Sequence, residues 1–161
     1  MVADVDDLIV VGSQAILGQF AGAPAELLIP NGADVFPKMH PDRADLIDST
    51  IGEGSPFDKA FGYYAHGVAE STSILPAGWR DRLILVSGEN TRFVRGWCLE
   101  VHDLAIAKYV AGREKDRDFT RALVKHGMVQ RQILEERLAA TQVAAEIRAR
   151  VEARIGADFA A

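Results

Sequence analysis

The chain is poor in the residues that identify several classes of protein. Its one cysteine, Cys98, excludes an internal disulfide framework and a cysteine-based zinc cluster, and it fits a reducing compartment such as the cytoplasm. Lysine and arginine number 18 against 23 acidic residues, and the net charge of -5 argues against broad adhesion to nucleic acid or anionic lipid. No stretch approaches the roughly 20 apolar residues of a membrane span, and residues 1–7 are acidic where a signal peptide would be basic. These absences predict a soluble, cytoplasmic protein.

The residues that are present favour one domain, with or without a helical appendage. Of the 161 residues 48% are hydrophobic, which is enough for one core but hardly for two. Short β-branched runs between turn residues extend to Val86, and a helical period takes over from Val101. The sequence therefore predicts the strands of one sheet followed by a helical C-terminal third.

Hydrophobic period and turn residues give the expected elements. Strands are expected over 8–11, over 26–29 and 33–36 around an interruption at Pro30-Asn31-Gly32, and over 63–68, 73–75 and 82–86. Helices are expected over 13–20, 41–48, 103–111, 116–125 and, as one long stretch, 129–155.

The most informative feature is an apolar strand that runs into a glycine-serine turn and a helix. The strand over 8–11 is followed by Gly12 and Ser13, and such a turn aims backbone N–H groups at an anion. Asp34 lies in the next strand, where a carboxylate can hold a divalent cation beside a phosphate. Each half has a plainer interpretation, because Ser13 also suits a helix cap and Asp34 a turn. Together they suggest a nucleotide site.

A lysine on the first C-terminal helix is the second candidate. Lys108 lies beside an apolar stripe at three- and four-residue spacing. It either extends to solvent or points into a cleft and neutralises a polyphosphate. The charged run over 113–118, which holds Lys115 and Asp118, is either part of such a site or a solvated surface with ion pairs.

Other reactive side chains receive no catalytic role. Cys98 is expected to pack as a small hydrophobe, and His66 and His102 accompany no Ser-His-Asp or HExxH pattern. Glu100 either adds a carboxylate at the end of a strand or caps the helix that follows. The apolar seam of the last helix is narrow, so it packs along the domain or against a partner, and a homodimer, a partner protein and a frayed end all stay open.

Five stretches carry a resemblance to a known family. They are Val-Gly-Ser-Gln-Ala-Ile-Leu at 11–17, Ala-Asp-Val-Phe-Pro at 33–37, Phe-Gly-Tyr-Tyr-Ala-His-Gly-Val at 61–68, Leu-Pro-Ala-Gly-Trp-Arg-Asp-Arg-Leu at 75–83, and His-Asp-Leu-Ala-Ile-Ala-Lys-Tyr-Val-Ala-Gly-Arg-Glu-Lys-Asp-Arg-Asp-Phe at 102–119. Their order resembles a group of small bacterial nucleotidyltransferase-like proteins of unassigned function, related to AbiEii-type toxins, over nearly the whole chain. The resemblance implies the polymerase-beta-like nucleotidyltransferase fold, an α+β fold with a small mixed sheet flanked by helices and a helical C-terminal part. A nucleotidyltransferase-like domain would span 1–127 and a C-terminal helical extension 128–161.

The resemblance also assigns roles by motif. Gly12 and Ser13 match the phosphate-binding turn of the family, and Asp34 matches the second carboxylate of an Asp-x-Asp pair that would hold Mg²⁺. In one place the chain departs from the pattern, because Gly32 stands where the family has its first metal carboxylate.

The remaining matches lie in the C-terminal half. Lys108 matches a helix-borne lysine that contacts the triphosphate, and Lys115 and Asp118 belong to the Lys-x-Arg-Asp motif that follows. In this scheme Lys115 binds nucleotide and Asp118 orients Lys108 or the acceptor. The implied reaction is attack of a hydroxyl on the α-phosphate of a nucleoside triphosphate, with release of pyrophosphate.

The resemblance therefore implies a Mg²⁺-dependent transfer of a nucleotide to an RNA or protein acceptor. The protein would be a toxin-antitoxin component, with an antitoxin or a second copy bound through the C-terminal helix. The missing carboxylate favours an alternative, a catalytically degenerate binding or regulatory protein of the same fold, and an oligomerising structural protein is a third interpretation. An RNA acceptor would need a basic groove, for which the candidates are Arg80, Arg82, Arg92 and Arg95.

Overall fold

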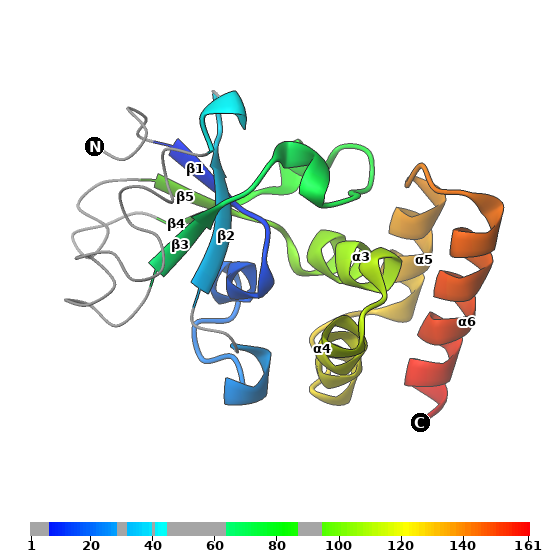
Figure 1. Cartoon of the computed structure of the whole chain (residues 1–161). Coiled ribbons are helices and arrows are strands. Elements are labelled where there is room, and N and C mark those ends of the chain that lie inside the picture. The colour runs from blue at the N-terminus through cyan, green and yellow to red at the C-terminus, as the bar shows by residue number, and fades with distance from the viewer. Residues whose placement is uncertain (1–6, 29–31, 40, 45–63, 87–94) are drawn as a thin grey trace. The chain divides into compact units, whose positions relative to one another are not determined.

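The computed structural model describes residues 7–28, 32–39, 41–44, 64–86 and 95–161 (Figure 1). The chain forms two compact units. The first comprises Met1–Thr72 and Leu83–Leu99 and contains the sheet, and the second comprises Ser73–Arg82 and Glu100–Ala161 and contains helices α3 to α6. The expected boundary at residue 127 falls within the second unit, and the division into 1–127 and 128–161 stays a prediction.

Within the described residues, the first unit is built on a five-stranded mixed sheet with strand order β3-β2-β1-β5-β4. Its strands are β1 (Asp7–Val10), β2 (Gly32–Pro37), β3 (Tyr64–Gly67), β4 (Ile84–Val86) and β5 (Arg95–Cys98). β1 runs antiparallel to β2 and parallel to β5, while β2 is parallel to β3 and β4 is antiparallel to β5. This mixed sheet, together with the helical C-terminal part, confirms the expected α+β fold class (Figure 1).

The strand register decides which side chains form the core of the first unit. Ile9 and Phe36 are opposite one another on β1 and β2, and both are fully buried. Cys98 lies on the other face of the sheet, against which the 3-10 helix η2 (Ser13–Gly18) packs. A Cβ at Gly18 would lie 2.7 Å from the Cβ of Cys98, so the glycine allows η2 to rest directly on β5.

Two expected elements near the N-terminus are wrong in type or length. The helix expected over 13–20 is the shorter η2, and the strand expected over 26–29 is replaced at Ala25–Leu27 by the 3-10 helix η3. Pro24 has a φ of -55°, which suits the start of a helical turn, and the N–H of Leu28 donates to the carbonyl of Ala25 at 3.0 Å. Leu27 is fully buried, so the apolar run is explained by burial of a turn and not by a strand.

The segment between β3 and β4 also differs from expectation. Residues 73–75 are not a strand, and the residues before β4 form the 3-10 helices η5 (Glu70–Thr72) and η6 (Trp79–Arg82). Residues Ser73–Arg82 belong to the helical unit, since the N–H of Ala77 donates to the carbonyl of Ala140 at 2.9 Å. Of the helix expected over 41–48 the structure describes the 3-10 turn η4 (Pro41–Arg43), and residues 45–48 lie outside the described part.

The second unit is a bundle around α3. Its helices are α3 (Val101–Ala111), α4 (Glu114–Lys125), α5 (Arg131–Ala139) and α6 (Ala145–Ala160). α3 contacts each of the other three helices, and 9 of its 11 residues are buried. It ends at Gly112, whose φ of 64° is left-handed and favours glycine. Across the described chain, no helix combines the length and the apolar content that crossing a membrane demands.

The single helix expected over 129–155 is wrong, because the chain breaks between α5 and α6. Thr141 donates from its hydroxyl to the carbonyl of Arg137 at 2.7 Å, and such a bond competes with a continuing helix. Arg148 donates to the carbonyls of Leu138 and Thr141 at 2.6 and 2.7 Å, which satisfies groups at the end of α5. The break folds the apolar seam inward, where these side chains are at most 2% exposed: Leu134, Leu138, Val151 and Ile155.

Candidate functional site

The turn between β1 and η2 brings Gly12 against the side chain of Asp34. A Cβ placed on Gly12 would lie 2.8 Å from Oδ2 and 3.0 Å from the Cβ of Asp34, so a larger residue requires a shift. The backbones are joined as well, since the N–H of Val11 donates to the carbonyl of Asp34 at 2.9 Å. Because the φ of Gly12 is -86°, which any residue can adopt, the close approach of Asp34 is the reason for glycine here. The two halves of the sequence motif therefore meet.

Ser13 is the first residue of η2, and Gly12 occupies the N-cap position. The N–H of Ala15 donates to the carbonyl of Gly12 at 2.9 Å and closes the turn. The side-chain amide of Gln14 donates to the carbonyl of Leu28 at 3.0 Å and fixes η2 to the next loop. Ser13, which is half-buried, is thus held beside Gly12 without serving as the N-cap residue.

Asp34 contributes a single carboxylate to this turn. Gly32 lies two residues earlier on β2, hence on the same face of the strand, where the first carboxylate of an Asp-x-Asp pair would stand. Among the residues that the structure describes, no three acidic, histidine or cysteine side chains gather closely enough to hold a metal. Mg²⁺ in nucleotide sites is held by one or two carboxylates, waters and substrate phosphates. Asp34 therefore fits the one-carboxylate form of such a site.

Lys108, in the second unit, lies against a buried carboxylate of α4. Its Nζ is 3.6 Å from Oδ1 of Asp116 and 5.2 Å from the ring centroid of Phe119, and its side chain is 14% exposed. The Asp116 side chain is fully buried and also accepts from Nε of Arg113 at 2.7 Å. The lysine is therefore held by its partners and does not extend freely into solvent.

The carboxylate that faces Lys108 is Asp116, which sequence reasoning missed. The signal was present, because Asp116, Phe119 and Leu123 follow helical spacing and all three are buried on one face of α4. Asp118 points away from that face, with a side chain 69% exposed and an oxygen 3.4 Å from Nη1 of Arg121. Lys115 is exposed as well.

The candidate residues are divided between the two units. Gly12, Ser13 and Asp34 belong to the first unit, whereas Lys108, Lys115 and Asp118 belong to the second. The structure brings Gly12 to Asp34, and it brings Lys108 to a neighbouring acid on α4. A common cleft for Asp34 and Lys108 stays a prediction.

A buried ion-pair network organises the start of α3. Asp103 is fully buried and accepts from Nε and Nη2 of Arg82, both at 2.9 Å, and from Nη1 of Arg137 at 2.9 Å. Arg137 also donates to Glu100 at 2.8 Å. Two arginines from separate elements thus converge on one helix, a pattern that the sequence did not reveal because the partners are 21 and 34 residues apart from Asp103.

Glu100 caps α3, which confirms one of its two expected roles. Its side chain accepts from the N–H of His102 at 2.7 Å. Burial alone would raise the pKa of Glu100, but hydrogen bonds from the ring and backbone of His102 and the charge of Arg137 lower it to about 2. His102 Nε2 accepts from the N–H of Gln130 at 3.0 Å, so His102 links the start of α3 to the start of α5.

The basic groove expected from four arginines stays a prediction, because its described members are divided between the two units. Arg80 and Arg82 belong to the helical unit and Arg95 to the sheet unit, and Arg92 lies outside the described residues. Arg82 is bound to Asp103, as described above, and Arg95 donates to Asp7 at 2.9 Å. Arg80 stacks on the ring of Trp79, 4.8 Å from its centroid.

Cys98 packs as expected for a small hydrophobe. Its side chain is buried under η2, and burial raises the pKa of the thiol to about 11 although a backbone hydrogen bond from Gly18 acts in the opposite direction. A thiol with so high a pKa stays protonated near pH 7 and is a poor nucleophile.

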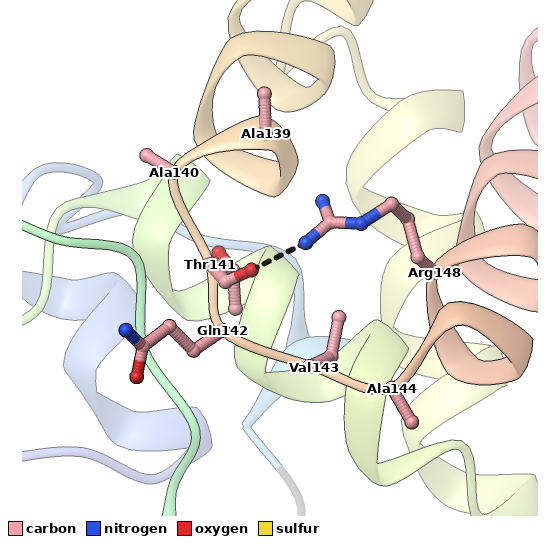
Figure 2. Close-up of a pocket in the computed structure, with 7 residues that line it drawn as sticks. All are labelled: Ala139, Ala140, Thr141, Gln142, Val143, Ala144 and Arg148. Carbon is pink, nitrogen blue, oxygen red and sulfur yellow. Dashed lines mark hydrogen bonds between the residues drawn. The ribbon is translucent and has the colours of Figure 1, made fainter.

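Figure 2 shows a hollow at the turn between α5 and α6, lined by Ala139 to Ala144 and Arg148. The guanidinium of Arg148 reaches across it to the carbonyl of Thr141. Nη1 and Nη2 of Arg148 both donate hydrogen bonds to carbonyl groups at the end of α5, so this arginine has a structural role. None of the predicted site residues lines the hollow.

Comparison with known proteins assigns the chain to a family. A family profile described as nucleotidyltransferase of unknown function (DUF6036) matches residues 2–156. The matched range includes parts of both units and all of the residues considered above. No curated protein and no solved structure matches the chain.

Proposed function

We propose, on the premise that this chain belongs to the family of nucleotidyltransferases of unknown function, that it binds a nucleoside triphosphate at the turn between β1 and η2 and transfers the nucleotide to an acceptor. The family implies a nucleotide substrate. The observation that carries the proposal is the contact of Gly12 with Asp34, because it joins a backbone turn suited to phosphate with the carboxylate expected beside it. Glycine at this position lets both the acid and a phosphate approach the backbone closely.

In the proposed reaction the acceptor hydroxyl forms a bond to the α-phosphorus, the bond from that phosphorus to the β-phosphate breaks, and pyrophosphate leaves. The hydroxyl proton passes to solvent. The turn at Gly12 and Ser13 would hold the β- and γ-phosphates, and Lys108 and Lys115 would neutralise their charge. Mg²⁺ held by Asp34 and the phosphates would stabilise the negative charge that develops on the transferred group. Asp118 would orient the acceptor.

The acceptor and the partners belong to the same proposal. RNA and protein hydroxyls are both suitable acceptors, and a relation to AbiEii-type toxins would make the protein a toxin-antitoxin component. The apolar seam of α5 and α6 is buried within the helical unit. An antitoxin or a second copy bound at α6 would therefore contact its charged, exposed face.

Calorimetry with each of the four ribonucleoside triphosphates, with and without Mg²⁺, tests this proposal. We expect Mg²⁺-dependent binding of at least one nucleotide that Asp34→Asn and Lys108→Met each weaken about tenfold or more, as expected for lost charge-assisted contacts. Asp42→Asn, a charge-matched change at an exposed position of η4, serves as the control. Nucleotide binding that none of these variants alters would place the ligand elsewhere and overturn the site.

A second function is favoured by one specific observation, the glycine at position 32 on the face of β2 that carries Asp34. A carboxylate there would complete the Asp-x-Asp pair that the family resemblance implies for Mg²⁺, and in its absence the protein would bind nucleotide without transferring it. Transfer of radiolabel from an α-labelled triphosphate, measured for the native chain and for Gly32→Asp, separates the two functions. Label transfer by the native chain favours the enzyme, and transfer gained only by Gly32→Asp favours the degenerate binding protein.

A further inference from the structure

Four arginines gather where α4, α6 and the end of α3 meet. Arg117 and Arg121 are four residues apart on α4, and Arg150 and Arg154 are four residues apart on α6, so each pair shares one helix face. α4 and α6 are in contact with one another. This arrangement concentrates positive charge in a protein whose net charge is -5.

Two of these arginines converge on the bare Cα of Gly112. A Cβ there would lie 2.7 Å from Nη1 of Arg154 and 3.3 Å from Nη2 of Arg150. Arg150 donates to the carbonyl of Val110 at 2.7 Å, which accounts for its position at the C-terminal end of α3. Nη1 of Arg154 is covered and has no hydrogen-bond partner within the described part of the chain.

Asp118 and Asp158 lie near these arginines, and the charge of Asp158 favours the charged form of Arg154. Asp158 accepts from the hydroxyl of Tyr109 at 2.7 Å, and Asp118 lies 3.4 Å from Arg121, with the side chains of Asp118 and Arg121 both more than half exposed. Partial burial lowers the pKa of Arg154, and the like charges of Arg117, Arg150 and Arg121 lower it further. The cluster therefore contains mutual repulsion that an anion would relieve.

We propose that Arg117, Arg121, Arg150 and Arg154 form a binding site for phosphate groups, whose ligand is the phosphodiester backbone of a nucleic acid. Arginine is suited to phosphate because its guanidinium group offers paired donors to two oxygens. One phosphate group can accept paired hydrogen bonds from about two guanidinium groups. Four arginines on two helices therefore match a ligand that carries several phosphates in a row. The inference is independent of the transfer reaction, because it concerns binding by the helical unit.

The test uses the full chain and a fluorescein-labelled single-stranded oligoribonucleotide, with anisotropy measured at several salt concentrations. Arg117→Gln/Arg121→Gln removes two exposed charges from the site, and Lys38→Gln/Arg131→Gln removes two charges that are not part of the arginine cluster. We expect the first variant to weaken binding about tenfold and to reduce the salt slope by about 1.4, at about 0.7 for each lost phosphate contact with a single strand. The control variant should bind like the native chain.

Inorganic tripolyphosphate, titrated by calorimetry against the same three proteins, distinguishes the sources of phosphate. Tripolyphosphate binding that depends on Arg117 and Arg121, without binding of the oligoribonucleotide, would keep the phosphate site and overturn the nucleic-acid ligand. Equal weakening by the two double variants would show general charge attraction and overturn the site. Circular dichroism melting of each double variant checks that the substitutions leave the fold intact.

Discussion

The carboxylate of Asp34 occupies the space beside Gly12 at the turn where β1 enters η2, since a Cβ on Gly12 would lie only 2.8 Å from Oδ2 of Asp34. The register of β1 and β2 sets this contact, because Val10 pairs with Val35 and the chain turns just beyond that pair. The glycine is therefore required by a neighbour that is 22 positions away in the sequence.

Gly12→Ala should destabilise the protein by about 1–3 kcal/mol, since the added methyl group overpacks a closed contact. It should also weaken Mg-nucleotide binding, because the turn or Asp34 must move. Gly22→Ala is the matched control, as a Cβ at Gly22 meets nothing within 4 Å. Urea unfolding gives the free energies, and the cost of Gly12→Ala should be smaller when Asp34 is also changed to Gly. An equal cost in both backgrounds would contradict the contact.

The sequence predicted this pairing because both partners lie in local patterns, a strand that ends in Gly12 and a strand that carries Asp34. It did not predict Asp116 as the partner of Lys108, since the charged run around it suggested a solvated surface. Asp116 is buried because it shares a face of α4 with Phe119 and Leu123. That face cannot be recognised from the charged run alone, because Phe119 and Leu123 follow the run. The charge pattern of this run alone therefore does not predict that Asp116 is buried.

Lys108 and Asp116 should show coupled stability. Asp116→Asn removes the carboxylate charge that lies 3.6 Å from the largely buried ammonium of Lys108, and Lys108→Met removes a cation near a fully buried carboxylate. Each single change should destabilise the protein by about 1–3 kcal/mol, with the double variant less unstable than the sum of the two. A double-mutant cycle from urea unfolding measures the coupling. If the losses of stability in the two single variants add up in the double variant, Lys108 and Asp116 do not stabilise one another despite their separation of 3.6 Å.

Glu100 should make stability depend on pH in the acid range. Its pKa is lowered from 4.5 to about 2 in the folded chain, so its contribution is complete above pH 4.5 and is lost as the pH falls to about 2. Glu100→Gln should cost up to about 3 kcal/mol at pH 7, because each unit of pKa shift corresponds to about 1.4 kcal/mol. Unfolding free energies of both proteins, measured between pH 7 and pH 2, should converge at the acid end. If the two unfolding free energies differ by the same amount at every pH, the loss of stability comes from the geometry of the helix cap and not from the charge of Glu100.

The segment before β4 has a structure that the local sequence pattern does not predict. Residues 73–75 and 82–86 both have the composition of strands, yet β4 begins only at Ile84 and Ser73–Arg82 joins the helical unit. Two bonds join the end of this segment to Asp103, a partner that no local sequence window contains. The break between α5 and α6 is similar, because Arg148 stabilises it from the following helix.

Asp103→Asn tests whether this network holds Ser73–Arg82 against α3. The substitution removes a negative charge that is fully buried between Arg82 and Arg137, and it leaves two cations with fewer acceptors. Breaking a buried pair from one side typically costs about 3–5 kcal/mol, so we expect a loss of that order in urea unfolding. Native-state hydrogen exchange should show the amide of Ala77 less protected, since its bond to Ala140 depends on the same segment. Arg95→Gln, which breaks an ion pair of the other unit, should leave that amide unchanged. Equal loss of protection in both variants would mean that the segment is held by something other than Asp103.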